Sequence, residues 1–483
     1  MRTKLLLFLT VSLLVLISLA SSQAQTLVPL VNQLPGVHQA FLLTDGTVMA
    51  ERIPDIGTTE WWKLTPDITG SYLNGTWSQL ASVPYAASVF SSAVLADGRL
   101  VFQGIEFFNE EFALSNKGAI YDPITNRWTP LEPPSGWCYM GECPSVVLPD
   151  GRWLIGWKLG KRMAALDPVT LTWTEMAYRG KNDSHAEEGW TLLPDGTVLT
   201  VDITDAPNSE KYIPWLQTWV TAGSTIVDLH EPPASGCVPY GRHQERCYYP
   251  PGEVGPAILR PDGTVFATGA AYHAAGHTAI YTPPAVPTDP GTWMPGPDFP
   301  RNSAVDTEAV LLPSGNVLVQ TLSGQCYEFN GTKFIPVGKA RGVMLLLPTG
   351  EVLINYRESK LYTSANTSYS PDWAPRITAY PTTVIRGSEY LISGQQFNGL
   401  SQAVTVGDEF QNATNYPLVR ITNEATGHVF YARTHHHSTM GVATGNAIVS
   451  THFDVPAGME TGSSSLEVVA NAIPSQSVTI TVE

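Results

Sequence analysis

Positive charge is scarce in this chain, and that scarcity restricts its partners. The 483 residues include 27 Lys and Arg against 43 Asp and Glu, a formal net charge of −16 at pH 7. Because nucleic acids and anionic membranes are bound mainly through Lys and Arg, we expect neither as a partner. The acidic surface is interpreted as a contribution to solubility.

Long apolar runs are also scarce, and the one present lies at the N-terminus. Two basic residues precede the apolar stretch 5–19, and a small-x-small cleavage sequence, Ser22-Gln23-Ala24, follows it. This order is typical of a secretory signal peptide. We therefore expect residues 1–24 to be a signal peptide and the mature chain to begin at about Gln25, outside the cytoplasm. No later window is apolar enough for a transmembrane segment.

Cysteine is the third scarce residue, with five copies. Cys237 and Cys247 flank a short loop, and an oxidising compartment favours a disulfide between them. Cys138 and Cys143 are a second candidate pair. Cys326 is then left as a buried thiol.

The most informative feature is a short hairpin motif that occurs seven times. At residues 147–155 two apolar runs flank a Pro-Asp-Gly turn, which predicts a β-hairpin whose turn needs a residue tolerant of positive φ. Counted from Gly to Gly, successive copies are 52, 53, 45, 67, 52 and 35 residues apart. Repeats of roughly 40 to 50 residues made of short strands indicate a β-propeller. The seven turn glycines are Gly46, Gly98, Gly151, Gly196, Gly263, Gly315 and Gly350.

A second marker follows the turns. Most repeats place an aromatic residue after a polar turn, and an element such as Tyr121-Asp122-Pro123 precedes several of them. Beyond Trp373 both markers stop, and residues 376–483 show short alternating strands instead, which predicts an immunoglobulin-like sandwich. The six aromatic markers are Trp77, Trp128, Trp173, Trp219, Trp293 and Phe334.

The Asp-Gly hairpin, the Tyr-Asp-Pro element and the outer Trp together resemble the kelch repeat. Seven copies over about residues 30–370, with a C-terminal sandwich after them, resemble the galactose oxidase and glyoxal oxidase superfamily. The resemblance implies an all-β chain, with a seven-bladed kelch-type β-propeller over 25–372 and an immunoglobulin-like β-sandwich over 373–483. It does not specify an activity, because kelch propellers host enzymes and binding modules alike.

The oxidases of that superfamily hold one copper at the propeller axis with a Tyr cross-linked to a Cys, a second Tyr and two His. Cys143, followed by Pro, matches the cysteine, and His435, preceded by Thr, matches the C-terminal histidine. The cross-linked Tyr is expected near 185–188 and the Tyr-His pair near 304–307, and neither segment contains a Tyr. Three of the five ligands are absent, so we expect the copper-radical oxidation to be lost.

The remaining alternative for copper binding is a set of ligands at other positions. Tyr272, His273 and His277 include a Tyr-His pair, but they follow the hairpin turn at Gly263. We therefore expect them on the second strand of their repeat or in the turn after it, away from the axis.

The positions nine residues before each turn glycine are expected to face the axial opening. Carboxylates occupy three of them, and His435 and His436 are expected above the opening. We identify Glu142, Glu187, Asp306, His435 and His436 as candidate ligands of a divalent cation such as Mn, Ca or Zn. The alternative is a ring of solvated charges around a water-filled channel. The seven positions are Val37, Val89, Glu142, Glu187, Val254, Asp306 and Arg341.

Two further observations bear on ligand binding. The 67-residue interval contains an insertion at 228–252, rich in Pro and Gly, that carries His243 between two cysteines. Long loops on a rigid scaffold often carry recognition, so we include His243, with Arg341 and the three carboxylates, among the candidate ligand-binding residues. A surface excursion without a ligand is the alternative. Of the three consecutive residues 435–437, all His, at most two can share a site.

The sequence thus favours a secreted binding module for an extracellular glycan or protein. The alternatives are a divergent galactose oxidase-like copper enzyme, and a hydrolase or lyase that uses Glu142, Glu187 and Asp306 as acid, base or metal ligands. A structural component of the cell envelope is a third. The cofactor stays open between copper and another divalent cation, and no oligomeric state is predicted.

Overall fold

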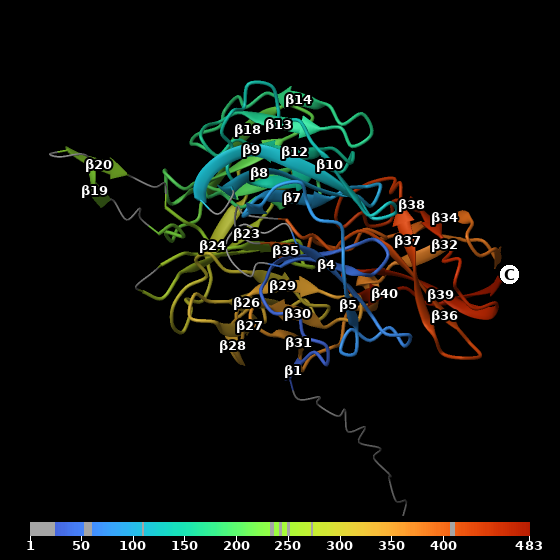
Figure 1. Cartoon of the computed structure of the whole chain (residues 1–483). Coiled ribbons are helices and arrows are strands. Elements are labelled where there is room, and N and C mark those ends of the chain that lie inside the picture. Colours follow the sequence, from blue (N-terminus) through green and yellow to red (C-terminus); the bar gives the residue numbers. More distant parts are fainter. Residues whose placement is uncertain are drawn as a thin grey trace, which may run out of the picture.

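The computed structural model describes residues 25–483 except 53–59, 109–110, 232–235, 241–243, 249–251, 272–273 and 406–410. Its strands form seven blades in a ring, followed by a separate group of strands at the C-terminal end (Figure 1). This confirms the predicted all-β propeller of seven repeats. The predicted signal peptide, 1–24, lies outside the described residues.

Each blade is an antiparallel sheet. In blades 1 to 6 the four main strands succeed one another in chain order from the ring axis to the rim, whereas blade 7 takes its outermost strand from the N-terminal end of the propeller segment. Two blades carry one extra short strand, namely β6 (Ala87–Ser88) in blade 2 and β35 (Val404–Thr405) in blade 6. From innermost to outermost, the strands are β2 (Val37–Leu42), β3 (Val48–Arg52), β4 (Trp61–Thr65) and β5 (Thr76–Gln79) in blade 1; β7 (Ser91–Val94), β8 (Leu100–Phe108), β9 (Glu111–Asp122) and β10 (Arg127–Pro130) in blade 2; β11 (Ser145–Val147), β12 (Trp153–Gly156), β13 (Met163–Leu166) and β14 (Trp173–Met176) in blade 3; β15 (Thr191–Leu192), β16 (Val198–Val201), β17 (Asn208–Ile213) and β18 (Thr218–Ser224) in blade 4; β21 (Ala257–Leu259), β22 (Val265–Thr268), β23 (Thr278–Thr282) and β24 (Thr292–Pro295) in blade 5; β25 (Ala309–Leu311), β26 (Val317–Gln320), β27 (Gln325–Phe329) and β28 (Phe334–Lys339) in blade 6; and β29 (Val343–Leu346), β30 (Val352–Asn355), β31 (Ser359–Thr363) and β1 (Thr26–Pro29) in blade 7.

Blade 7 closes the ring with strands from both ends of the propeller segment. β1 pairs antiparallel with β31, with Leu27 opposite Tyr362. The first described strand of the chain is therefore the outermost strand of the last blade, and the backbone hydrogen bonds of this pair hold the ring shut.

The predicted hairpin turns connect the two innermost strands of every blade. All seven turn glycines have φ between 75° and 91°, in the left-handed region that residues with a Cβ rarely adopt. In each turn the Gly N–H donates to the carbonyl three residues earlier, as Gly151 does to Leu148 at 2.9 Å. We call the side of the ring that carries these turns the turn face, and the side where the innermost strands begin the start face.

The aromatic markers lie on the outermost strand of their blades, as predicted. Each stands opposite a residue of the third strand; Trp128, for example, faces Tyr121 with ring centroids 5.1 Å apart. Several of these indoles also reach the preceding blade, because Trp128 Nε1 donates to Ala81 O at 3.0 Å and Trp173 Nε1 donates to Glu132 O at 2.8 Å. The markers thus bind neighbouring blades together.

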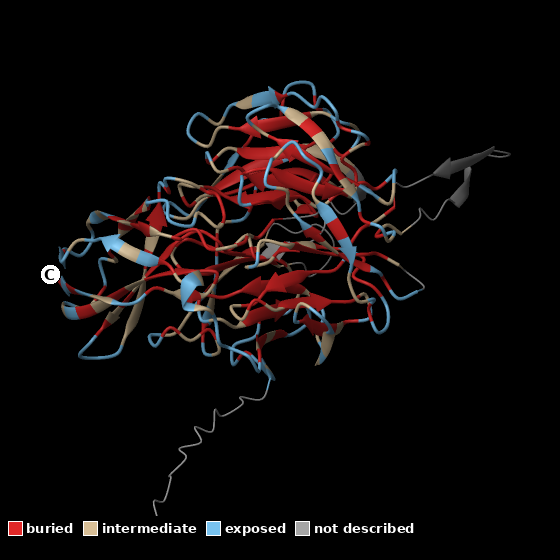
Figure 2. Ribbon diagram, turned by 180° about the vertical axis from the view of Figure 1, so that it is seen from behind, coloured by how far each residue is buried: buried red, intermediate tan, exposed pale blue. Residues whose placement is uncertain are grey.

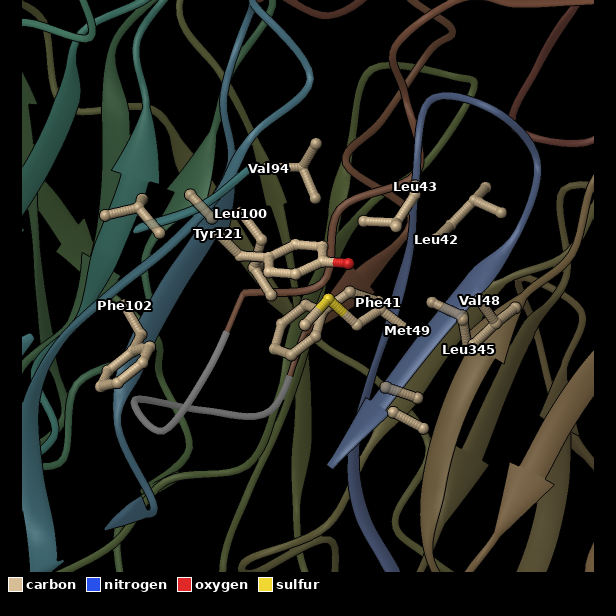
Figure 3. Packing of buried hydrophobic residues seen from close by; sticks show 14 of the residues in the cluster. Phe41, Leu42, Leu43, Val48, Met49, Val94, Leu100, Phe102, Tyr121 and Leu345 are labelled. Atoms are coloured by element: carbon tan, nitrogen blue, oxygen red, sulfur yellow. The ribbon is translucent and has the colours of Figure 1, made fainter. Parts of the chain in front are cut away.

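The apolar core lies between the blades, and the inner strands are its main source. Strands β12 and β16 are buried along their whole length, whereas β5 and β10 on the rim are largely exposed (Figure 2). Figure 3 shows one such contact, where Phe41 and Met49 of blade 1 pack between side chains of blades 2 and 7.

The C-terminal strands form a sandwich that packs on the turn face. A short 3-10 helix, η1 (Pro371–Trp373), precedes it, and β37 takes part in both of its layers. Backbone bonds join it to the hairpin turns, since Thr434 N donates to Thr44 O at 3.0 Å and Met440 N donates to Pro149 O at 3.1 Å. Its strands are β32 (Arg376–Ala379), β33 (Thr383–Val384), β34 (Glu389–Gln395), β36 (Leu418–Asn423), β37 (Val429–His435), β38 (Val449–Asp454), β39 (Gly462–Ala470), β40 (Ile473–Pro474) and β41 (Val478–Val482).

One segment of the sandwich enters the ring. We call residues 401–416 the axial segment, of which the structure describes 401–405 and 411–416. The described part contains β35, which pairs with β25 of blade 6. Asn412 Nδ2 donates to Ala40 O of blade 1 and to Met344 O of blade 7, each at 3.3 Å. Because these described residues contact the innermost strands of blades 1, 6 and 7, they lie within the ring.

The cysteine predictions have mixed outcomes. Cys138 and Cys143 do not form the proposed disulfide, because Cys138 is exposed while Cys143 is buried. Cys326 is the predicted buried thiol, and burial raises its pKa to about 11. Cys237 and Cys247 stand directly opposite each other on β19 (Gly236–Tyr240) and β20 (Gln244–Tyr248), and their disulfide stays a prediction.

We predict that Trp128→Phe lowers the free energy of unfolding by about 1–2 kcal/mol, because Phe keeps a ring but loses the indole donor to blade 1. Urea unfolding measures this change. Trp215→Phe is the matched control, since Trp215 is 57% exposed. Equal stability losses in the two variants would contradict the role given to the indole bond.

Candidate functional site

The start face carries the residues found by counting back from the turns. Val89, Glu187 and Asp306 all have positive φ, between 44° and 57°, just before an innermost strand. The chain therefore turns sharply at these positions as it enters a blade, and such strained backbone is common at functional sites.

Glu142 and Glu187 come together around a lysine that the sequence interpretation overlooked. Lys158, in the turn after β12, forms an ion pair with Glu142 and lies 2.9 Å from Glu187 Oε1 and 3.3 Å from Glu106 Oε1. The Glu142 side chain is 3% exposed. The cation expected among these carboxylates is thus an ammonium of the chain itself.

A second buried cluster lies beside the first, in blade 4. Lys181 Nζ lies 2.5 Å from Asp183 Oδ1 and 2.6 Å from both Glu188 Oε1 and Glu210 Oε2. Glu188 Oε2 also contacts His185 Nδ1 at 3.2 Å. Glu187 pairs with Lys158 of blade 3 while its neighbour Glu188 pairs with Lys181, so segment 185–188 contributes to both clusters.

Burial and charge act in opposite directions in the Lys181 cluster. Burial alone would lower the pKa of Lys181, but Glu188, Asp183 and Glu210 outweigh it and hold that pKa above its ordinary value. Burial raises the pKa of Glu188 well above its usual range and that of Asp202 to about 7. One ammonium therefore cannot keep all the surrounding carboxylates ionised at neutral pH.

Asp306 and Arg341 lie on the start face but apart from Glu142 and Glu187. Asp306 precedes blade 6 and Arg341 precedes blade 7, whereas the Lys158 cluster belongs to blades 2 to 4. The structure therefore gathers two of the three predicted carboxylates and leaves the third on another side of the ring.

Arg341 belongs to a basic groove between blades 6 and 7, with a volume of about 430 Å³. The Arg357 guanidinium stacks near the Tyr356 ring, 5.8 Å from its centroid. Glu358 is the single acidic residue among the groove residues and pairs with Lys360 at 2.9 Å. The four cations of the groove are Lys339, Arg341, Arg357 and Lys360.

The prediction that His435 and His436 lie above the axial opening beside the carboxylates is wrong. Both residues belong to the sandwich at the turn face, since the adjacent His437 N donates to Ala96 O at 3.2 Å. The innermost strands separate them from Glu142 and Glu187. The prediction failed because the Thr-His match identified a strand end, whereas the residues that enter the ring belong to the described part of the axial segment.

Other predicted residues have simpler outcomes. His243, Tyr272 and His273 lie outside the described residues. His277 lies just before β23, where it pairs with Asp298 at 2.8 Å and is largely exposed. His437 points away from His435, because its Nδ1 contacts Thr451 Oγ1 at 2.9 Å in the sandwich interior. The expectation that at most two of the three His share a site therefore agrees with the structure.

A signal for the two lysines existed in the sequence. Lys158 lies between the second and third strands of blade 3, and in a four-stranded blade that connection returns to the face where the innermost strand starts. Lys181 lies in the link that leads to the next innermost strand, on the same face. The prediction considered only positions nine residues before the turn glycines, so it missed both lysines.

Comparison with known proteins supports this fold. No family model matches the chain. The Kelch-like protein terF of Aspergillus terreus is 28% identical over 137 residues, which cover 27% of this chain and 28% of that protein's length. A solved fungal alcohol oxidase of the AA5 family, in complex with copper, matches 96% of this chain and 100% of its own with a TM-score of 0.53 and 15% identity. Virginiamycin B lyase from Staphylococcus aureus gives a TM-score of 0.48 at 12% identity over 71% of this chain and 99% of its own.

The fold of this chain is that of the kelch and galactose oxidase-like superfamily. The propeller, its Asp-Gly hairpins and the following sandwich agree with that resemblance. In the part of the chain that the structure describes, no helix has the length and hydropathy to cross a bilayer.

We predict that Lys181→Met lowers the free energy of unfolding by about 3–5 kcal/mol at pH 7, because it leaves buried carboxylates facing one another without a cation. The loss should shrink as the pH falls and these groups bind protons. Chemical denaturation at pH 7 and pH 5 measures both effects. Lys117→Met, at an exposed position, is the control, and a comparable loss in that variant would contradict the prediction.

Proposed function

We propose that this chain is a secreted binding module whose start face recognises an extracellular ligand and whose copper-radical site has been lost. The observation that carries the proposal is the position of Lys158. Its ammonium lies among Glu106, Glu142 and Glu187. Glu142 directly precedes Cys143, the one propeller residue that matches the oxidase set.

The donor set around Cys143 supports the loss of the copper site. Where the resemblance requires a tyrosine, blade 4 presents His185 and Glu188, and these side chains contact each other in the Lys181 cluster. The axial segment 401–416 contains no histidine in its sequence. These residues do not fit the two Tyr and two His of the oxidases, so we derive no reaction through copper.

The basic groove favours an anionic ligand, and among extracellular polymers we propose an acidic glycan. Four cations with one acid in a groove of about 430 Å³ form a local positive field on a chain of net charge −16. An aromatic ring beside the cations offers the flat apolar surface on which a sugar ring can pack. Volumes of this size are typical of small-ligand pockets.

We predict that the purified protein binds acidic glycans on a mixed array of acidic and neutral glycans, and that Arg341→Gln/Arg357→Gln weakens this binding at least tenfold. Raised ionic strength should weaken the wild-type interaction, because the attraction is electrostatic. Arg376→Gln, at an exposed position on the sandwich, should bind as the wild type does.

Two outcomes would overturn the proposal. Stoichiometric copper by metal analysis, together with a tyrosyl-radical signal by electron paramagnetic resonance, would establish an oxidase. Glycan binding that is unaffected in the groove variant but lost on deletion of the β19–β20 hairpin would place recognition on the insertion instead.

A further inference from the structure

Three neighbouring strands of the sandwich bring imidazole and carboxylate groups to one place. β38 lies between β34 and β37, and in this register His435 stands opposite His452 while Glu389 stands opposite Asp454. Directly paired residues of antiparallel strands point to the same face of a sheet. Residues 451 and 453 of β38 are buried in the interior, so His452 and Asp454 point outward.

The distances within this group are those of a metal coordination shell. His435 Nε2 lies 3.2 Å from Asp454 Oδ1 and 3.8 Å from Glu389 Oε2, and the ligand atoms of these three residues all lie within 4.8 Å of one another. A tetrahedral Zn²⁺ with bonds of about 2.1 Å separates its ligand atoms by about 3.4 Å. The three atoms therefore need to move only slightly to share one ion.

A fourth candidate ligand, His452, lies beside this group of three. His452 Nδ1 lies 2.6 Å from the other oxygen of Glu389, and its ring centroid is 5.8 Å from that of His435. We propose that His435, His452, Glu389 and Asp454 form a binding site for a late transition-metal cation, and that this cation is Zn²⁺. Two imidazoles with two carboxylates suit such an ion, whereas Ca²⁺ and Mg²⁺ select shells made of oxygen.

The neighbours of these residues orient them for this role. His436 has φ of 52°, and its Nδ1 lies 2.5 Å from His435 Nδ1, so the second nitrogen of the His435 ring is engaged while Nε2 faces the carboxylates. Arg433 Nε donates to Asp454 Oδ2 at 3.0 Å and leaves Oδ1 toward His435. Contacts of this kind fix ligand geometry in metal sites.

The charge and exposure of the group also favour a cation. Two carboxylates against Arg433 leave a net negative charge while the imidazoles are neutral. Glu389, Asp454 and His452 have side chains 52%, 39% and 38% exposed, and His435 is 2% exposed. An ion can therefore enter from solvent and be held against a buried ligand. Arg433 Nη1 also donates to Asp97 O at 3.1 Å, so the site adjoins the turn face of the propeller.

The test uses the full chain, stripped with a chelator and titrated with zinc sulfate by isothermal calorimetry near pH 7.5. We expect one Zn²⁺ per chain and a rise in melting temperature on saturation, because an ion that binds only the folded state stabilises it. Glu389→Gln and His452→Gln, both at partly exposed positions, should each raise the dissociation constant at least tenfold and reduce the thermal shift.

The chain offers a matched control in the same domain. His428, the residue before the first residue of β37, pairs with Glu460 at 2.7 Å, and His428→Gln should leave zinc binding unchanged. Far-ultraviolet circular dichroism checks that all three variants are folded. Wild-type protein that does not bind zinc saturably, equal affinities in the wild type and both ligand variants, or equal affinity for Ca²⁺ would each overturn the proposal.

Discussion

Closure of the ring is the constraint on which the rest of this structure depends. A four-stranded blade is apolar on both faces and can bury them only against two neighbours, so the seven blades need a closed circle. The pairing of β1 with β31 supplies that closure. Once the ring is closed, all innermost hairpins turn on one side and all innermost strands begin on the other. The sandwich covers the first side, and the start face remains available for side-chain chemistry.

The repeating parts of this architecture were predictable because the same local requirement recurs in each blade. Every innermost hairpin needs a left-handed residue, and Gly at positions such as Gly46 and Gly350 meets that need. Trp128 and its equivalents were predictable for the same reason. The axial segment 401–416 was not, because its contacts with blades 1, 6 and 7 join residues that no local pattern relates.

The candidate site shows where reasoning from one sequence stops. Counting back from the turn glycines correctly predicted that Glu142 and Glu187 lie close together. Buried carboxylates require a counter-charge. The sequence does not show whether the counter-charge of these two carboxylates is a metal ion or a lysine ammonium. Lys158 and Lys181 supply it from within the chain, through contacts between separate turns and blades.

The group at the centre of the carboxylates distinguishes the Lys158 and Lys181 clusters of the propeller from the His435 site of the sandwich. In both propeller clusters a lysine Nζ occupies the centre of the carboxylates, so a metal would have to displace a well-bound ammonium. At Glu389 and Asp454 the central group is the His435 imidazole, which donates an electron pair when neutral and is a ligand rather than a counter-ion. Arg433 reaches only the far oxygen of Asp454. Of the two histidines that the sequence assigned to the propeller axis, His435 thus belongs to the proposed metal site, which is formed by the pairing of β34, β38 and β37 rather than at the axis.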